Sequence, residues 1–197
     1  MRETPIIADR DGMNDAVLRT RAVAAARGDT PFDVLISGGT LVDVVTGELR
    51  PADIGLVGPL IASVHPTGSR QDTAQVLDAT GGYVAPGLID THMHIESSMV
   101  TPASYAAAVV AKGVTTVVWD PHEFANVHGL DGMSWASRAS RNLPLRTILL
   151  APSCVPSAPG LERAGANFDA TVLAEILFWP EVGGVAEVIN MRGVIER

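Results

Sequence analysis

The sequence predicts an α/β protein, in which a small β-sandwich segment precedes the N-terminal half of a TIM-like (β/α)8 barrel. Three observations lead to this fold class. Short β-rich runs between glycine turns fill 31–80, strands alternate with helices over 81–197, and polar side chains come directly after those strands. Residues 1–30 are expected to form an N-terminal helical extension, with a surface helix over 14–26 that stops at Gly28.

The segment 31–80 reads as closely spaced strands. The β-rich runs are 33–36, 40–44, 53–57 and 60–64, and the turns between them are Gly38-Gly39, Thr46-Gly47 and Gly58-Pro59. Strands spaced in this way predict a small antiparallel sheet or sandwich. None of its residues is a catalytic candidate.

After Gly81-Gly82 the pattern changes to apolar strands that alternate with helical stretches. Strands are expected over 84–91, 114–119, 145–151 and 183–189, and helices over 101–112, 131–141 and 169–178. Alternation of this kind indicates a parallel sheet that helices cover on both faces.

Polar side chains directly after the strands favour a barrel over an open sheet. They are His92, His94 and Glu96 after the first strand, Asp120, His122 and Glu123 after the second, Ser153 after the third, and Glu187 on the fourth. In a β/α barrel the carboxyl ends of the strands meet at one mouth. A doubly wound sheet usually has a Gly-rich phosphate turn after its first strand, and this sequence has none there.

His92 and His94 are the leading metal-ligand candidates. Residues two apart on a strand point to the same face, so both imidazoles can reach one divalent ion such as Zn, Mn or Fe. The alternative is a pair packed in the core, where each ring would need a hydrogen-bond partner. The spacing favours ligation and a metal-dependent hydrolase.

Glu187 stands among apolar neighbours, Val185, Ala186, Val188 and Ile189. A carboxylate on so apolar a strand is costly unless it is paired or bound to a metal. The sequence therefore leaves two roles open for Glu187, a partner in a structural ion pair or a metal ligand.

The remaining site candidates surround these ligands. Glu96 could orient a ligand, bind substrate or move a proton, or it could cap the loop. Ser97 and Ser98 could contact substrate, although capping the next helix is the stronger alternative. The predicted catalytic residues are Glu96, Asp120 and His122, and the predicted substrate contacts are Ser97, Ser98 and Glu123.

Composition limits the classes of partner that the protein is expected to bind. The net charge is −8, Lys112 is the single lysine and no basic run occurs, so neither nucleic acid nor an anionic membrane is expected as a partner. Cys154 is the single cysteine, which excludes an internal disulfide and fits a cytoplasmic protein; it is expected to be a small buried apolar residue. No leader or membrane-spanning stretch is expected.

Several segments carry a family resemblance. Residues 86–94 resemble the first barrel strand of the amidohydrolase superfamily, and 36–43 resemble its N-terminal sandwich piece. The bacterial adenine deaminase family is similar in four further segments, 94–99, 115–123, 126–132 and 186–195. The resemblance extends from about Phe32 to the C-terminus.

The resemblance implies hydrolytic deamination of adenine to hypoxanthine and ammonia by a metal-activated water. His92, His94 and Glu187 would hold the metal, with manganese favoured and iron or zinc possible. The ligand would be a purine base, and the complete enzyme would be a homo-oligomer. Many cyclic amidases of the superfamily have a carboxylated lysine at the place of Glu187, and its absence counts against a dihydroorotase or hydantoinase.

Length sets a further expectation. A closed barrel needs eight strands and about 200 residues, whereas this chain supplies roughly four strands. The resemblance places further metal-binding histidines and a proton-transferring aspartate on later strands, beyond Arg197. We therefore expect the N-terminal portion of an adenine deaminase, inactive without the missing half that closes the barrel. The alternatives are another amidohydrolase, such as an N-acyl amino-sugar deacetylase, or a non-catalytic fragment.

Overall fold

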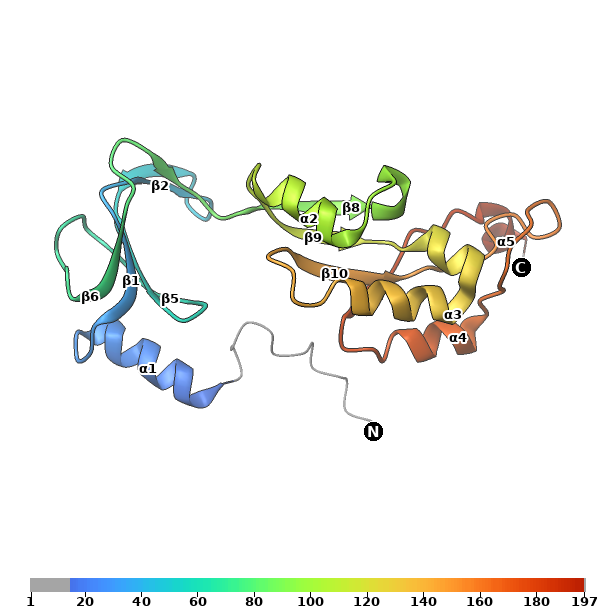
Figure 1. Ribbon diagram of the computed structural model, residues 1–197, viewed down its shortest axis with the longest axis horizontal. Coiled ribbons are helices and arrows are strands. Elements are labelled where there is room, and N and C mark those ends of the chain that lie inside the picture. Colours follow the sequence, from blue (N-terminus) through green and yellow to red (C-terminus); the bar gives the residue numbers. More distant parts are fainter. Residues whose placement is uncertain (1–14, 197) are drawn as a thin grey trace. The chain divides into compact units, whose positions relative to one another are not determined.

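The computed structural model describes residues 15–196, which fall into two compact units that meet between Pro86 and Gly87 (Figure 1). The first fourteen residues of the predicted N-terminal extension lie outside the described part of the chain. None of the described helices is both long and apolar enough to cross a membrane.

Helix α1 (Ala16–Arg27) opens the first unit. The side chain of Asp15 accepts hydrogen bonds from the backbone N–H groups of Val17 and Leu18, and the helix ends at Gly28 in the left-handed conformation, with φ 89°. The predicted helix and its stop are confirmed. Its buried alanines, Ala22 and Ala25, share a core with Phe32, Leu35 and Val57, so the helix packs on the neighbouring sheet.

Two sheets complete this unit. The four-stranded sheet has the order β5-β4-β1-β6, and the three-stranded sheet has the order β3-β2-β7. The strands are β1 (Phe32–Ser37), β2 (Thr40–Asp43), β3 (Glu48–Pro51), β4 (Asp53–Val57), β5 (Leu60–His65), β6 (Thr73–Asp78) and β7 (Tyr83–Val84). The predicted antiparallel pairing holds for three of the strand pairs, β1 with β4, β4 with β5 and β2 with β3, whereas β6 pairs with β1, and β7 with β2, in parallel. Strand β6 was missed because its residues are mostly exposed and lack an apolar pattern.

Asp53 is the fully buried carboxylate of this unit, with 0% of its surface exposed. One carboxylate oxygen accepts the N–H of Gly38 at 2.9 Å, and the other accepts the N–H of Gly68 at 2.8 Å. Burial opposes ionisation of Asp53, but the two N–H donors outweigh it, and its pKa is held below the usual value. Asp53 thus ties two turns to β4.

The second unit is built on a parallel sheet of four strands with the order β11-β10-β9-β8. The strands are β8 (Leu88–Met93), β9 (Val114–Trp119), β10 (Arg146–Ala151) and β11 (Val182–Val185), and each pairs in parallel with its neighbour in the chain. Neighbours that follow chain order, joined by helices, are the arrangement of a β/α barrel. The predicted fold class is therefore confirmed for the part of the barrel that this chain contains.

The helices of this unit follow the strands in turn (Figure 1). They are the 3₁₀ turn η1 (Ile95–Ser98), α2 (Pro102–Val110), α3 (His122–Ala139), α4 (Ala170–Ile176) and α5 (Met191–Ile195). The core combines strand residues such as Val117 and Leu149 with Met133 and Ile176 from the helices. This core holds the strands in place, and the candidate site lies at the carboxyl ends of these strands.

Three predicted elements in this unit have wrong boundaries. The strand expected over 84–91 is β8 at Leu88–Met93, so it begins later and includes His92. The helix expected over 131–141 begins nine residues earlier, at His122, and kinks at Gly129, where φ is 59°. A glycine in that conformation interrupts the helical pattern, which hid the first half of the helix. The strand expected over 183–189 ends at Val185, so Glu187 follows the strand instead of lying on it.

Candidate metal centre

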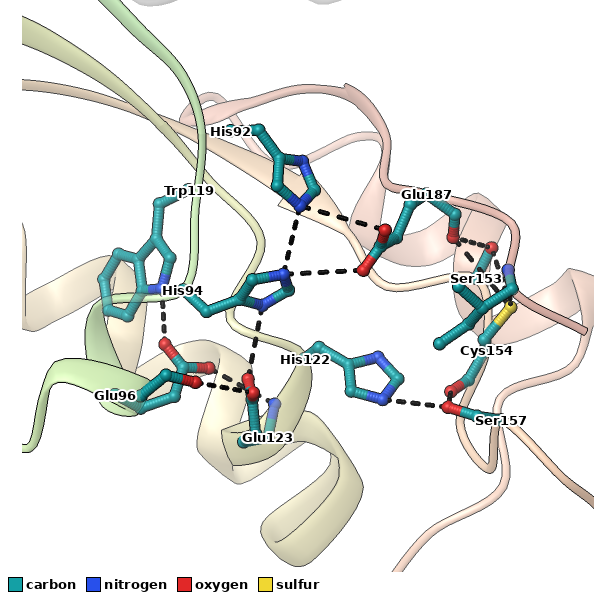
Figure 2. A network of polar contacts seen from close by, with 12 residues as sticks. His92, His94, Glu96, Trp119, His122, Glu123, Ser153, Cys154, Ser157 and Glu187 are labelled. Carbon is teal, nitrogen blue, oxygen red and sulfur yellow. Dashed lines mark hydrogen bonds and ion pairs between the residues drawn. The ribbon is translucent and has the colours of Figure 1, made fainter.

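Three predicted ligands meet at the ends of β8 and β11. His92 Nε2 lies 3.1 Å from His94 Nε2 and 3.8 Å from Glu187 Oε2, and His94 Nε2 lies 3.4 Å from Glu187 Oε1 (Figure 2). One ligand atom from each residue lies within 4.8 Å of the others. His92 is on β8 and His94 comes directly after it, and the structure brings their two imidazoles together.

The separations fit a bound divalent ion. Ligands about 2.0–2.1 Å from a tetrahedral metal lie about 3.3 Å from one another, and the three measured distances, 3.1, 3.4 and 3.8 Å, bracket that value. Two imidazole nitrogens and a carboxylate form a donor set that Zn, Mn and Fe all accept. The residues therefore suit the ion that the fold class implies.

A second cluster lies on the other side of the His94 ring. His94 Nδ1 is 3.3 Å from Glu123 Oε2, but this buried nitrogen has no partner in hydrogen-bond geometry among the described residues. Glu96 is held by the indole N–H of Trp119, at 2.6 Å, and by the backbone N–H of Glu123, at 3.2 Å. The Ser97 hydroxyl donates to Glu123 Oε1 at 2.9 Å. The predicted residues Glu96, Ser97 and Glu123 thus form one network with His94.

The two carboxyls of this network have different pKa values. Burial raises the pKa of Glu96 to about 7, with a further contribution from Glu123, although the bond from Trp119 opposes the rise. Burial also disfavours ionised Glu123, but hydrogen bonds from Glu96 and Ser97 outweigh it and lower its pKa. Glu123 therefore ionises first and Glu96 keeps its proton to near neutrality, the division expected of an acid and its charged neighbour.

Asp120 is a second buried acid beside this network. Only 1% of its surface is exposed, and neither carboxyl oxygen has a hydrogen-bond partner among the described residues. Burial raises its pKa to about 7; the charges of Glu187 and Glu123 add to the rise, and that of His94 opposes it. Buried carboxyls without partners are rare and concentrate at functional sites.

His122 is the first residue of α3 and faces the loop after β10. Its Nε2 lies 3.1 Å from the Ser157 hydroxyl, which itself donates to the carbonyl of Cys154 at 3.2 Å. Because a hydroxyl has one proton to donate, and Ser157 gives it to the carbonyl of Cys154, the Ser157 oxygen can accept from His122 Nε2–H. In that tautomer of the neutral ring, Nδ1 is the acceptor.

Some residues differ from their predicted role in the site. The Ser98 hydroxyl donates to the carbonyl of Ile95 at 2.6 Å, a bond within η1, and the structure does not bring it into the network. Trp119 is buried in the core and also donates its indole N–H to Glu96. No pattern in the sequence indicated Ser157, the partner of His122. Ser153 could be selected because it is a polar residue that follows the third predicted strand.

Comparison with known proteins agrees with this geometry. The model of the amidohydrolase family matches residues 83–191 of the chain. The chain belongs to the amidohydrolase family. Among solved amidohydrolase structures, the L-hydantoinase (dihydropyrimidinase) of Arthrobacter aurescens is 25% identical with a TM-score of 0.50, covering 66% of this chain and 29% of that one. That likeness supports the barrel fold.

Curated relatives of this amidohydrolase are adenine deaminases. Adenine deaminase 2 of Agrobacterium fabrum is 75% identical over 191 residues, which are 97% of this chain and 32% of the relative. The adenine deaminase of Klebsiella pneumoniae is 54% identical over 182 residues, 92% of this chain and 30% of the relative. The resemblance inferred from the sequence is confirmed, and the chain spans about a third of the length of these relatives.

Proposed function

We propose that this chain supplies the first part of the active site of an adenine deaminase, which converts adenine and water to hypoxanthine and ammonia. The observation that carries the proposal is the meeting of two imidazoles and Glu187 beside Glu96, a carboxyl whose pKa burial raises to about 7. Identity of 75% to a protein named adenine deaminase supports adenine as the purine base.

A divalent ion, manganese in our proposal, would be held by His92, His94 and Glu187. Such an ion, when bound, makes a hydroxide available near neutral pH by lowering the pKa of its water. The carboxylate of Glu187 lies against Nε2 of both imidazoles, so the three groups would converge on one ion.

The acidic side chains of the site would transfer the protons that the reaction requires. Deamination at C6 of the purine needs a proton at N1 and another on the departing amino group. Glu96, with a pKa of about 7, is suited to hold and release a proton at N1. Asp120 has a similar pKa, and His122 presents Nδ1 as an acceptor in the tautomer that donates to Ser157, so this pair would contact substrate or carry the second proton.

Ammonia release and hypoxanthine formation test the proposal. We would assay this chain with Mn²⁺ alone, and mixed with the part of the Agrobacterium fabrum relative that follows the matched region. We expect turnover of adenine in the mixture and its loss in Glu96→Gln, which cannot release a proton. Turnover of N-acetylated amino sugars in place of adenine would overturn the proposed substrate.

A further inference from the structure

Glu187 needs support that its strand does not provide. Strand β11 ends at Val185, and the last bond of the ladder runs from the N–H of Ala186 to the carbonyl of Ala151, at 2.9 Å. Ala186, just before Glu187, is buried, but the apolar residues that follow it, Val188 and Ile189, are exposed and do not anchor this side of the carboxylate. Something else must hold the backbone that carries this carboxylate.

Two side chains directly after β10 bind that backbone (Figure 2). The Ser153 hydroxyl donates to the carbonyl of Glu187 at 2.8 Å. Cys154 Sγ accepts the N–H groups of Ile189, at 3.1 Å, and Asn190, at 3.3 Å, and the thiol is buried with 3% of the residue exposed. Neighbouring side chains thus hold both ends of the segment 187–190.

We infer that Ser153 and Cys154 are positioning residues that set where the Glu187 carboxylate stands relative to His92 and His94. The inference rests on the proposed function only in taking Glu187 as a metal ligand. A metal site tolerates ligand displacements of about 0.2 Å, so loosening the backbone at Glu187 would weaken binding even though neither Ser153 nor Cys154 touches the ion.

The sequence alone suggested another role for Cys154, that of a small buried apolar residue. If Cys154 only filled space, replacing it by alanine would cost only local packing. If its sulfur accepts two backbone N–H groups, alanine would leave both donors without a partner. Serine keeps an acceptor at position 154 and alanine does not, so a comparison of the two substitutions distinguishes the packing role from the acceptor role.

The variants are Ser153→Ala, Cys154→Ala and the conservative Cys154→Ser. Ser140→Ala is the matched control: its hydroxyl also donates to a backbone carbonyl, that of Ser137 at 3.0 Å, in a buried position where Ser153 is half-buried, and it caps the end of α3 opposite His122. The loss of one hydroxyl–carbonyl bond is therefore the same in the control, without a contact to the segment 187–190.

Two measurements on the full chain decide the matter. In metal-free protein, amide hydrogen exchange at Ile189 and Asn190 is expected to be faster in Cys154→Ala, with protection restored in Cys154→Ser. Competition with a chromophoric chelator is expected to show Mn²⁺ affinity about 10- to 100-fold lower in Ser153→Ala and Cys154→Ala, and unchanged in Ser140→Ala.

Unchanged exchange at both amides, or equal Mn²⁺ affinity in Ser153→Ala and the unaltered chain, would overturn the inference. Failure of the unaltered chain to bind Mn²⁺ would instead count against the proposed metal centre. In that case exchange at Ile189 and Asn190, measured without metal, still decides whether Cys154 holds this backbone.

Discussion

Replacing Asp53 by asparagine tests how the first unit is held together. Asp53 accepts one backbone N–H on each carboxylate oxygen, from Gly38 at 2.9 Å and from Gly68 at 2.8 Å, with no exposed surface. Asparagine has one accepting oxygen, so its amide NH₂ would face one of these donors. An unpaired buried donor costs about 1–3 kcal/mol, and a bond to a charged group contributes about 1.5–3 kcal/mol.

We therefore expect Asp53→Asn to lower the free energy of unfolding of this unit by about 2–4 kcal/mol. Amide exchange of strands β1 and β4 measures it, because a loss of that size speeds exchange through unfolding by about 30- to 1,000-fold. Asp78→Asn is the control: Asp78 also accepts a backbone N–H, that of Thr80 at 2.9 Å, but it is exposed and water can replace the bond.

The pH dependence gives a second check. The pKa of Asp53 is lowered in the folded state, so its contribution to stability is present above the ordinary value of 3.8 and disappears as pH falls through the lower, folded value. The difference between the unaltered chain and Asp53→Asn should shrink as the pH falls below that value. A loss under 0.5 kcal/mol at pH 7, or a difference independent of pH, would refute the reasoning.

Three further predictions concern other buried groups. Trp119→Phe removes the indole donor that lowers the pKa of Glu96, so that pKa should rise above about 7 in a carbon-13 NMR titration; no rise would contradict the assigned bond. Gly55→Ala would place its Cβ 2.4 Å from the ring of Phe32 and should destabilise the first unit by about 1–3 kcal/mol in the same exchange assay, whereas a neutral effect would show that the ring can move. The pKa of Asp120 is raised from 3.8 to about 7, so its ionisation opposes folding increasingly as pH rises between these values. Metal-free Asp120→Asn should therefore be more stable than the unaltered chain by up to about 4 kcal/mol at pH 8 and similar to it at pH 4, as urea unfolding would show.

The sequence was sufficient for features that depend on local pattern. The strands β9 and β10 are rich in apolar residues, and the spacing of His92 and His94 predicted that their imidazoles meet, although only His92 lies on β8. A barrel brings the carboxyl ends of its strands to one mouth, so the meeting of Glu187, after β11, with the two histidines followed from the fold class.

Features that depend on contacts distant in the chain could not be predicted. The position of Glu187 is set by Ser153, which is 34 residues away, and not by a strand ladder. The bond between Trp119 and Glu96 joins residues 23 apart, and indole in an apolar strand gives no sign of such a partner. The start of α3 was hidden by the kink at Gly129.

The central claim is that His92, His94 and Glu187 hold one divalent ion, and a Mn²⁺ binding isotherm on the purified chain tests it most directly. Glu187→Gln keeps the shape of the side chain and removes its charge, and Glu175→Gln makes the same change at an exposed position on α4. We predict one ion per unaltered chain, affinity at least about 10-fold lower in Glu187→Gln, and no change in Glu175→Gln. Equal affinity in all three proteins, or no binding by the unaltered chain, would contradict the claim.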